Sequence, residues 1–191
     1  MKLLRLAAAL LSFAPLLAVG ADAPARALKI DRTRSFVDVD VSVTMSSFVA
    51  HLDQYDASFT LDDVGKVKAG SFKFKFTALK TGDDKRDAAM IKWLGGGSPE
   101  GLFQLGVLAL APDGQGVVNG NLKFHNSTQR IEFPVVVTQA NGTYAITGET
   151  NVDYTEWGLK VIRKAVVVKV DPVVRVRFKL IGEAVAVPAK T

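Results

Sequence analysis

Apolar and polar side chains alternate with a period of two residues in many segments of this sequence, and this pattern limits the folds that the chain can adopt. In SFKFKF, residues 71–76, three phenylalanines alternate with serine and lysine. The same alternation occurs in 35–43, 122–125 and 174–180. Successive side chains of a β-strand point to opposite faces, so each segment has one apolar and one polar face. Other apolar runs predict strands near 55–62, 102–111, 131–139, 143–152 and 164–171.

Turn signals separate the apolar runs. They are Asp63-Val64-Gly65, Pro112-Asp113-Gly114 and Asn141-Gly142, of which Asn-Gly is the clearest hairpin signal. Pro134 and Pro172 fall inside or beside predicted strands. Because proline donates no hydrogen bond, each requires an edge, a bulge or the start of a strand.

Many short strands, each with one apolar face, predict an all-β protein, either a sandwich or a barrel. We expect an antiparallel up-and-down barrel of about eight strands with its apolar faces inside. Such a barrel has an interior that side chains fill or that holds one small ligand. The inverted alternative has an apolar outer surface and a polar lumen. The many lysines and arginines on the polar faces argue against it, because a lumen of eight strands is too narrow for them.

Residues 83–94, DDKRDAAMIKWL, break the alternation. Ala88, Ile91 and Leu94 follow one another at helical spacing, and acidic residues occupy the first turn. The pattern predicts one short helix after the third strand. We expect one of the two leading aspartates to cap it and the three glycines at 95–97 to end it.

The N-terminal segment has the layout of a secretory signal peptide, with Lys2 and Arg5 before an apolar run that ends in small residues. We expect cleavage after Ala21, which leaves residues 22–191 as a single domain. The alternative, an uncleaved membrane anchor, is disfavoured because the run is short for a bilayer span and contains Pro15. The signal peptide (residues 1–21) predicts export, and we expect a periplasmic protein.

The composition excludes some partners. The sequence has no cysteine, so an exported form depends on its core rather than on disulfides. Without residues 1–21 the chain has 22 basic and 19 acidic residues, a net charge of +3. This balance is mild and shows no run of Lys and Arg, so we expect no nucleic-acid partner. No further apolar stretch is long enough to span a bilayer as a helix.

No combination of residues in the sequence indicates catalysis or a metal site. His51 and His125 have no carboxylates at a metal-binding spacing, and we expect both to face solvent. The chain has neither a thiol nucleophile nor a Gly-x-Ser-x-Gly elbow. An enzyme would need a titratable group in the cavity, and the only candidates are Asp153, Glu156 and Glu132. We therefore expect a protein that is not an enzyme and holds no metal.

Several motifs together resemble the YceI-like family of lipocalin-like, polyisoprenoid-binding periplasmic proteins. The strongest match is 79–87, LKTGDDKRD, which is similar to the family's Thr-x-x-x-x-Arg-Asp motif before its helix. Further matches lie at Ile30-Asp31, Ser35, 91–94, 120–122, 126–129 and 153–158. Ala88 stands where the family has a histidine, and Tyr154 where it usually has an arginine. The resemblance covers about residues 28–183.

This resemblance implies a lipocalin-like barrel that carries a long isoprenoid, such as a polyprenyl quinone, and has no other cofactor. The leading hypothesis is therefore an exported carrier of an apolar chain lipid. The expected ligand-binding lining is Val39, Val41, Phe72, Phe74, Phe76, Met90, Trp93, Leu94, Phe103, Leu122, Phe124, Trp157 and Phe178. We expect Tyr154 and Trp157 to meet a head group at the rim. Arg86 and Asp87 are expected to tie the helix to that rim.

Two other functions stay open at this stage. One is a structural or interaction module whose barrel interior is filled by side chains. The other is an enzyme that acts on a bound small molecule. The sequence also leaves open a homodimer formed through an edge strand.

Overall fold

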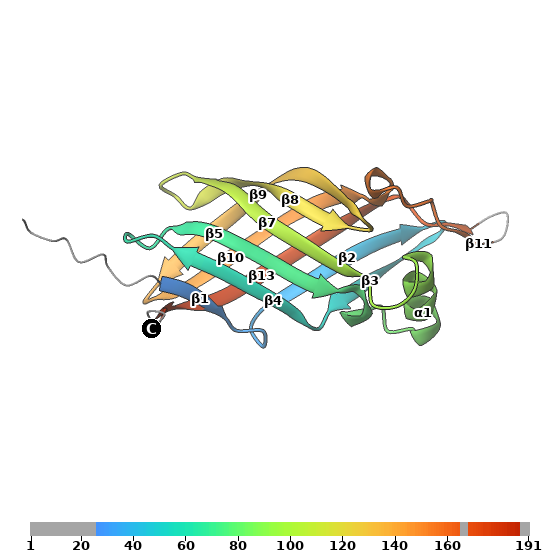
Figure 1. The fold of residues 1–191 in the computed structure, drawn as a ribbon, viewed down its shortest axis with the longest axis horizontal. Helices are drawn as coiled ribbons and strands as arrows, with labels where there is room; N and C mark the ends of the chain where they lie inside the picture. The colour runs from blue at the N-terminus through green and yellow to red at the C-terminus, as the bar shows by residue number, and fades with distance from the viewer. Residues whose placement is uncertain (1–25, 165–167, 188–191) are drawn as a thin grey trace, which may run out of the picture.

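The computed structural model describes residues 26–164 and 168–187, which form a closed β-barrel with a short helix at one end (Figure 1). The predicted signal peptide, residues 1–21, lies outside the described residues. The first part of the chain forms β1 (Arg26–Ile30), β2 (Phe36–Val43), β3 (Ser46–Leu52), β4 (Tyr55–Leu61), β5 (Val67–Lys75), the 3-10 helix η1 (Phe76–Ala78) and β6 (Leu79–Lys80). The second part forms α1 (Asp84–Trp93), β7 (Glu100–Leu110), β8 (Gln115–Phe124), β9 (Ser127–Ala140), β10 (Thr143–Asp153), the 3-10 helix η2 (Tyr154–Trp157), β11 (Arg163–Lys164), β12 (Val168–Lys169) and β13 (Val173–Ala186).

Eight long strands make the ring, and three of them consist of two pieces. β1 and β2 lie one after the other along β13, where Arg26 is opposite Ala186 and Asp40 is opposite Arg175. β3 continues into β4, and β5 continues through η1 into β6. Neighbours in the sequence are neighbours in the ring, and the pairing of β1 with β13 closes it. The structure thus confirms an antiparallel up-and-down barrel with one helix after the third long strand.

The predicted turns and proline positions are also confirmed. The three turn signals lie at the β4–β5, β7–β8 and β9–β10 connections. Asn141 and Gly142 have φ angles of 49° and 77°, the left-handed pair that a type I′ turn requires. Pro134 lies in β9 beside Val135, where the pairing with β10 stops. Pro172 immediately precedes β13.

The predicted strand at 164–171 is wrong. Only β11 and β12, of two residues each, form there, and they make a separate two-stranded sheet; residues 165–167 lie outside the described residues. A longer strand would have no partner, because β10 and β13 already pair with each other from Asp153 and Val173 onward. β1 and β3 were not predicted, since β1 is short and β3, SSFVAHL, does not alternate strictly.

The helix α1 begins and ends as predicted, but a different face packs inward. Asp83 is its N-cap and accepts hydrogen bonds from the amides two and three residues later, at 2.9 and 3.1 Å. Ala88 is exposed, although its helical spacing predicted that it would pack inward. Leu94, which shares that spacing, does pack against the barrel, together with Asp87 and Met90.

Buried side chains close the end of the barrel that lies opposite α1 in Figure 1. Leu28, Leu61 and Tyr144 are buried there in the main core cluster. The hydroxyl of Tyr144 donates a 2.8 Å hydrogen bond to the carbonyl of Gly65 in the β4–β5 turn. The guanidinium of Arg26 bonds to two carbonyls of the same turn, at 3.2 and 2.9 Å. This end therefore combines apolar packing with hydrogen bonds that hold the turn over it.

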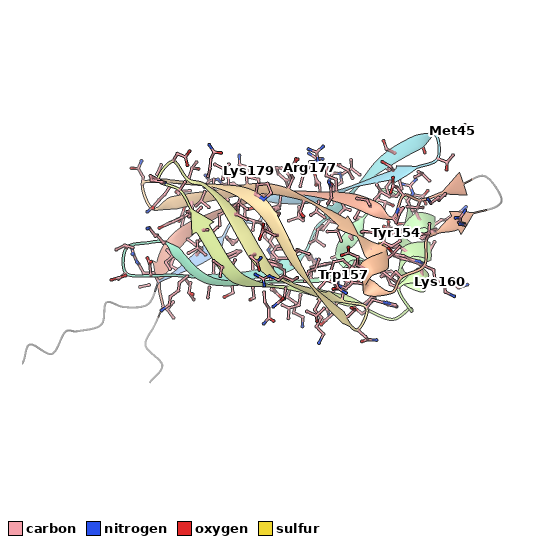
Figure 2. All side chains as sticks on the ribbon, turned by 90° about the horizontal axis from the view of Figure 1, so that it is seen from above. Met45, Tyr154, Trp157, Lys160, Arg177 and Lys179 are labelled. Carbon is pink, nitrogen blue, oxygen red and sulfur yellow. The ribbon has the colours of Figure 1, made fainter. Side chains whose placement is uncertain are left out.

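Charged side chains lie on the outer surface of the barrel (Figure 2). Arg177 donates two hydrogen bonds to the carboxylate of Asp40, at 2.7 and 2.9 Å. These bonds hold the pKa of Asp40 below its ordinary value. His51 lies in β3, is exposed as expected, and bonds to Asp38 at 2.8 Å. The outer surface of the barrel is therefore charged, which is the opposite of the alternative in which the outer surface is apolar and the lumen is polar.

Candidate functional site

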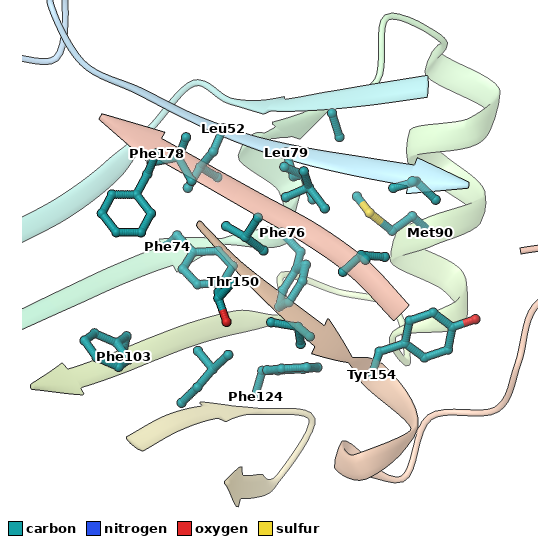
Figure 3. Close-up of a pocket in the computed structure, with 18 of the residues that line it drawn as sticks. Leu52, Phe74, Phe76, Leu79, Met90, Phe103, Phe124, Thr150, Tyr154 and Phe178 are labelled. Atoms are coloured by element: carbon teal, nitrogen blue, oxygen red, sulfur yellow. The ribbon is translucent and has the colours of Figure 1, made fainter. Parts of the chain in front are cut away.

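An apolar cavity of about 760 Å³ lies inside the barrel, between the closed end and α1 (Figure 3). Of the fourteen residues that the sequence analysis named, thirteen line it: Val39, Val41, Phe72, Phe74, Phe76, Met90, Trp93, Leu94, Phe103, Leu122, Phe124, Tyr154 and Phe178. The strand residues among them occupy the inward positions that the alternation predicts. Their contact with a ligand stays a prediction. The cavity itself shows that the interior is not filled by side chains.

The phenylalanines of SFKFKF belong to a row of aromatic rings along one wall of the barrel. Phe72 stacks on Tyr55 with ring centres 4.7 Å apart, and Phe74 and Phe76 follow with centres 5.1 Å apart. η1 interrupts the strand after Lys75, yet Phe76 still faces the cavity. Phe124 is the next ring, 5.6 Å from Phe76. The row gives the cavity a smooth aromatic wall instead of a filled centre.

Glycines on neighbouring strands make room for the rings of this lining. A Cβ at any of four glycines would overlap a phenylalanine ring on the adjacent strand. The pairs are Gly70 with Phe59, Gly101 with Phe74, Gly120 with Phe103 and Gly148 with Phe178. Each ring thus lies against bare backbone of the wall and extends less far into the lumen. These glycines were not predicted as part of the lining, because they occupy inward positions without a side chain.

Trp157 does not line the cavity, and its predicted position at the rim is wrong. It is 2% exposed and stacks on Phe124 from outside the lumen, with ring centres 4.5 Å apart. Its indole N–H donates a 3.0 Å hydrogen bond to the carbonyl of Leu122. Trp157 belongs to η2, which packs where β9 and β10 separate beyond Val135. It therefore fills the wall, and its N–H is already bonded.

Thr150 is a polar lining residue that the sequence analysis missed. It is an inward position of β10, between Gly148 and Val152, and its hydroxyl oxygen points into the cavity (Figure 3). Its hydroxyl has one contact within the protein, the carbonyl of Asn151 at 3.5 Å, which is longer than a normal O–H···O hydrogen bond. The other polar residues of the lining lie near α1, so this hydroxyl is isolated among apolar side chains.

The cavity reaches the α1 end of the barrel, where residues of the β2–β3 hairpin and of α1 line it together with Ile162 and Val170, and we place its opening there. Its polar lining residues other than Thr150 gather here: Ser46, Ser47, Thr81, Asp83, Lys85 and Arg86. The guanidinium of Arg86 lies 4.0 Å from the centre of the Phe48 ring and so spans from α1 to β3. Tyr154 lines the same region, and burial raises the pKa of its hydroxyl, which stays protonated at neutral pH.

Both ends of α1 are tied to the barrel across this opening. The carboxylate of Asp87, 9% exposed, accepts hydrogen bonds from the amide and the hydroxyl of Thr81, at 3.0 and 2.6 Å. At the other end, the indole N–H of Trp93 donates to the carbonyl of Lys160 at 2.9 Å. The expectation that Arg86 and Asp87 tie the helix to the rim is therefore correct in geometry.

The acids named as catalytic candidates lie outside the cavity. Asp153 caps η2 by accepting hydrogen bonds from Thr155, while Glu156 and Glu132 are exposed. Asp83 is the one carboxylate in the lining of the described residues, and it caps α1. In residues 26–164 and 168–187, no three His, Asp or Glu side chains are grouped to hold a metal ion. None of the helices in these ranges is long and apolar enough to cross a membrane.

These features define a closed antiparallel barrel whose apolar cavity opens at one end. The family described as YceI-like domain matches residues 28–181, which is most of the chain. The chain therefore belongs to the YceI-like family, as its motifs indicated. No curated protein matches the sequence significantly.

Solved structures with a similar fold include two bacterial proteins of nearly the same extent. BcnA of Burkholderia cenocepacia is 16% identical over 80% of this chain and 99% of its own, with a TM-score of 0.68. A polyisoprenoid-binding domain from Saccharophagus degradans, implicated in plant cell wall breakdown, is 17% identical over 85% and 100%, with a TM-score of 0.63. The YceI protein of Campylobacter jejuni is 10% identical over 75% and 87%, with a TM-score of 0.55. At these identities the similarity establishes the fold.

Proposed function

We propose that this protein is an exported, non-catalytic carrier that binds a long apolar lipid, such as an isoprenoid, inside the barrel. The observation that carries the proposal is the cavity of about 760 Å³, whose lining is apolar except for Thr150 and the polar residues at its opening. Burial of apolar chain surface provides the driving force and needs few polar contacts. Membership of the YceI-like family and the fold shared with the polyisoprenoid-binding domain support this ligand class.

The cavity volume limits the part of the ligand that is enclosed. At ~30 Å³ per water-sized group, the cavity holds a chain of about 25 atoms. At ~0.3 kcal/mol per heavy atom, such a chain gains roughly 7–8 kcal/mol, which corresponds to a micromolar dissociation constant. A ligand with a longer chain would extend through the opening beside α1. A polar head group would then meet Arg86, Lys85 and Thr81.

Lipid extraction tests the proposal. The protein is purified without detergent from a bacterial host, extracted with organic solvent, and the extract is analysed by mass spectrometry. A prenyl lipid in stoichiometric amount supports the carrier. A protein that carries no lipid, and that fails to take up a polyprenyl alcohol or quinone when one is offered, contradicts it.

A matched pair of variants links the lipid to the cavity. Val176→Trp places a large ring in the lumen, because Val176 lines the cavity. Val173→Trp adds the same ring on the outside of the same strand, where Val173 is 43% exposed. We expect Val176→Trp to lose most of the bound lipid and Val173→Trp to retain it. Equal retention by both variants would mean that the lipid binds elsewhere.

A further inference from the structure

The hairpin formed by β2 and β3 is part of the cavity's opening and also extends beyond it. Val43, Ser46 and Phe48 of this hairpin line the cavity. Its two-residue turn, Thr44 and Met45, lies at the outermost tip, at the same end of the molecule as Tyr154 and Lys160 (Figure 2). Because the other end of the barrel is closed by side chains, anything that enters the cavity passes this hairpin.

Met45 has an unfavourable position at this tip, both in its exposure to water and in its backbone conformation. Its side chain is 98% exposed, the highest value among the large hydrophobic residues of the described chain. Its φ angle is 67°, in the left-handed region that favours glycine or asparagine over other residues. Residues 41–50 contain no charged side chain. The tip of the hairpin therefore carries no charge and presents one apolar side chain, that of Met45, to solvent.

Basic side chains flank this apolar point. The amide of Thr44 donates to the carbonyl of Lys169 at 2.9 Å, and the amide of Lys169 donates to the Thr44 hydroxyl at 3.1 Å. Arg163 is paired with Lys169 in the two-stranded sheet, and both side chains are exposed. Lys85 is exposed on the α1 side of the opening.

The acids of this end are mostly engaged with backbone amides. Asp83 caps α1, and the carboxylate of Asp171 accepts a hydrogen bond from the amide of Val173 at 3.0 Å. Asp84 lies in the first turn of α1, where the helix dipole stabilises its negative charge. Arg163 and Lys169 are thus exposed on the two-stranded sheet that is hydrogen-bonded to the residue before Met45.

We propose that the open end of the barrel docks on a bilayer surface that contains anionic lipid, with Met45 inserted among the head groups. A protruding apolar side chain surrounded by lysine and arginine is the combination that binds such interfaces, through apolar burial and attraction to anionic lipids. Docking at this end would place the cavity's opening against the membrane from which a lipid enters. The inference rests on the proposed function for its purpose, but its test measures membrane binding alone.

Vesicle sedimentation tests the docking surface. The full-length protein is expressed in a bacterial host, purified from the soluble fraction, and its mass is measured to record whether residues 1–21 are present. It is mixed with vesicles of phosphatidylcholine alone, or of equal parts phosphatidylcholine and phosphatidylglycerol. We expect binding to the anionic vesicles, weaker binding as salt concentration rises, and little binding to phosphatidylcholine alone. Equal binding to both kinds of vesicle, or none, would overturn the proposal.

The variant Met45→Asn removes the apolar side chain while suiting the left-handed backbone, so the fold is kept. Val64→Asn is the matched control, because Val64 is 71% exposed in a turn at the closed end. We expect Met45→Asn to weaken binding to anionic vesicles at least about fivefold and Val64→Asn to leave it unchanged. Equal binding by Met45→Asn and the unchanged protein would overturn the role of Met45.

Two further measurements test the basic side chains and the independence of docking from lipid retention. Arg163→Glu combined with Lys169→Glu should reduce binding to anionic vesicles and its dependence on salt. Both Met45→Asn and the double variant should retain extracted lipid, since these side chains do not line the cavity. If the unchanged protein retains no lipid but binds anionic vesicles normally, the proposed function is contradicted and the docking surface is left intact. Capture of a protein partner through Met45, without vesicle binding, would replace the membrane as its occupant.

Discussion

The ring of Phe74 occupies the space in which a side chain at position 101 would stand. Phe74 and Gly101 are directly paired across β5 and β7, and a Cβ on Gly101 would overlap the ring. The ring therefore lies along the wall of the barrel, and the centre of the lumen stays open. The open space in the centre of the cavity therefore depends on Gly101, which has no side chain.

Gly101→Ala should displace the Phe74 ring into the lumen. We expect a loss of about 1–3 kcal/mol in the free energy of unfolding, typical of overpacking, together with less retained lipid. Urea denaturation and lipid extraction measure the two effects. The double variant Gly101→Ala with Phe74→Leu has room for the added methyl group and should recover most of both. A single variant as stable and as well loaded as the unchanged protein would show that the ring and the glycine are independent.

Thr150→Val should separate oxygenated ligands from pure hydrocarbons. Valine has the shape of threonine without the hydroxyl that points into the cavity. If a polar group of the ligand reaches Thr150, we expect roughly fivefold weaker binding of a prenyl alcohol or quinone, since one hydrogen bond contributes about 1 kcal/mol. A hydrocarbon of the same length should bind at least as well as before. Thr150→Ser, which keeps a hydroxyl, is the control for each titration.

Asp87→Ala should loosen the N-terminal attachment of α1. It removes an acceptor that is bonded twice by Thr81 and leaves a backbone amide without a partner. We expect a loss of about 2–3 kcal/mol in the free energy of unfolding. Asp84→Ala is the control, because Asp84 is exposed in the same turn and should cost under about 1 kcal/mol. Similar losses for the two variants would show that the contact with Thr81 contributes little.

The pair of Asp40 and Arg177 should give a defined dependence of stability on pH. Hydrogen bonds from Arg177 lower the pKa of Asp40 below its ordinary value of 3.8. A carboxylate whose pKa is lower in the folded state stabilises the fold above its unfolded pKa, and this contribution is lost as pH falls through the folded value. Asp40→Asn should therefore be less stable than the unchanged protein at pH 7, and the difference should shrink below pH 4. Thermal unfolding across this range would show the convergence; a constant difference would contradict it.

The alternation of apolar and polar residues predicts most of the barrel and of its lining. It can be read within a single strand, yet it decides which side chains face the lumen. Once the lumen is known to be apolar, the parity of Phe72 on β5 or Phe178 on β13 decides that each side chain faces inward. The cap at Asp83 is equally local, since the amides that it binds lie two and three residues away. Such features need no knowledge of the rest of the chain.

Features that depend on distant segments were not predictable in this way. Trp157 lies in η2, which has no two-residue period, and only the separation of β9 from β10 creates the gap that it fills. Thr150 is polar at an inward position, so the apolar alternation does not mark it as a lining residue. The apolar run at 164–171 has the composition of a strand, but the ring leaves it no partner.

One end of the barrel is closed, where Tyr144 bonds to the β4–β5 turn. This closed end determines how a ligand can enter and leave the barrel. A chain that slides into a blind tube with its tail first has to leave with its head first, by reversing the same path. Exchange of one molecule for another then cannot proceed by pushing from behind. The barrel would have to be emptied before it is refilled, so under the proposed function a donor and an acceptor would meet the same end of the protein, one after the other.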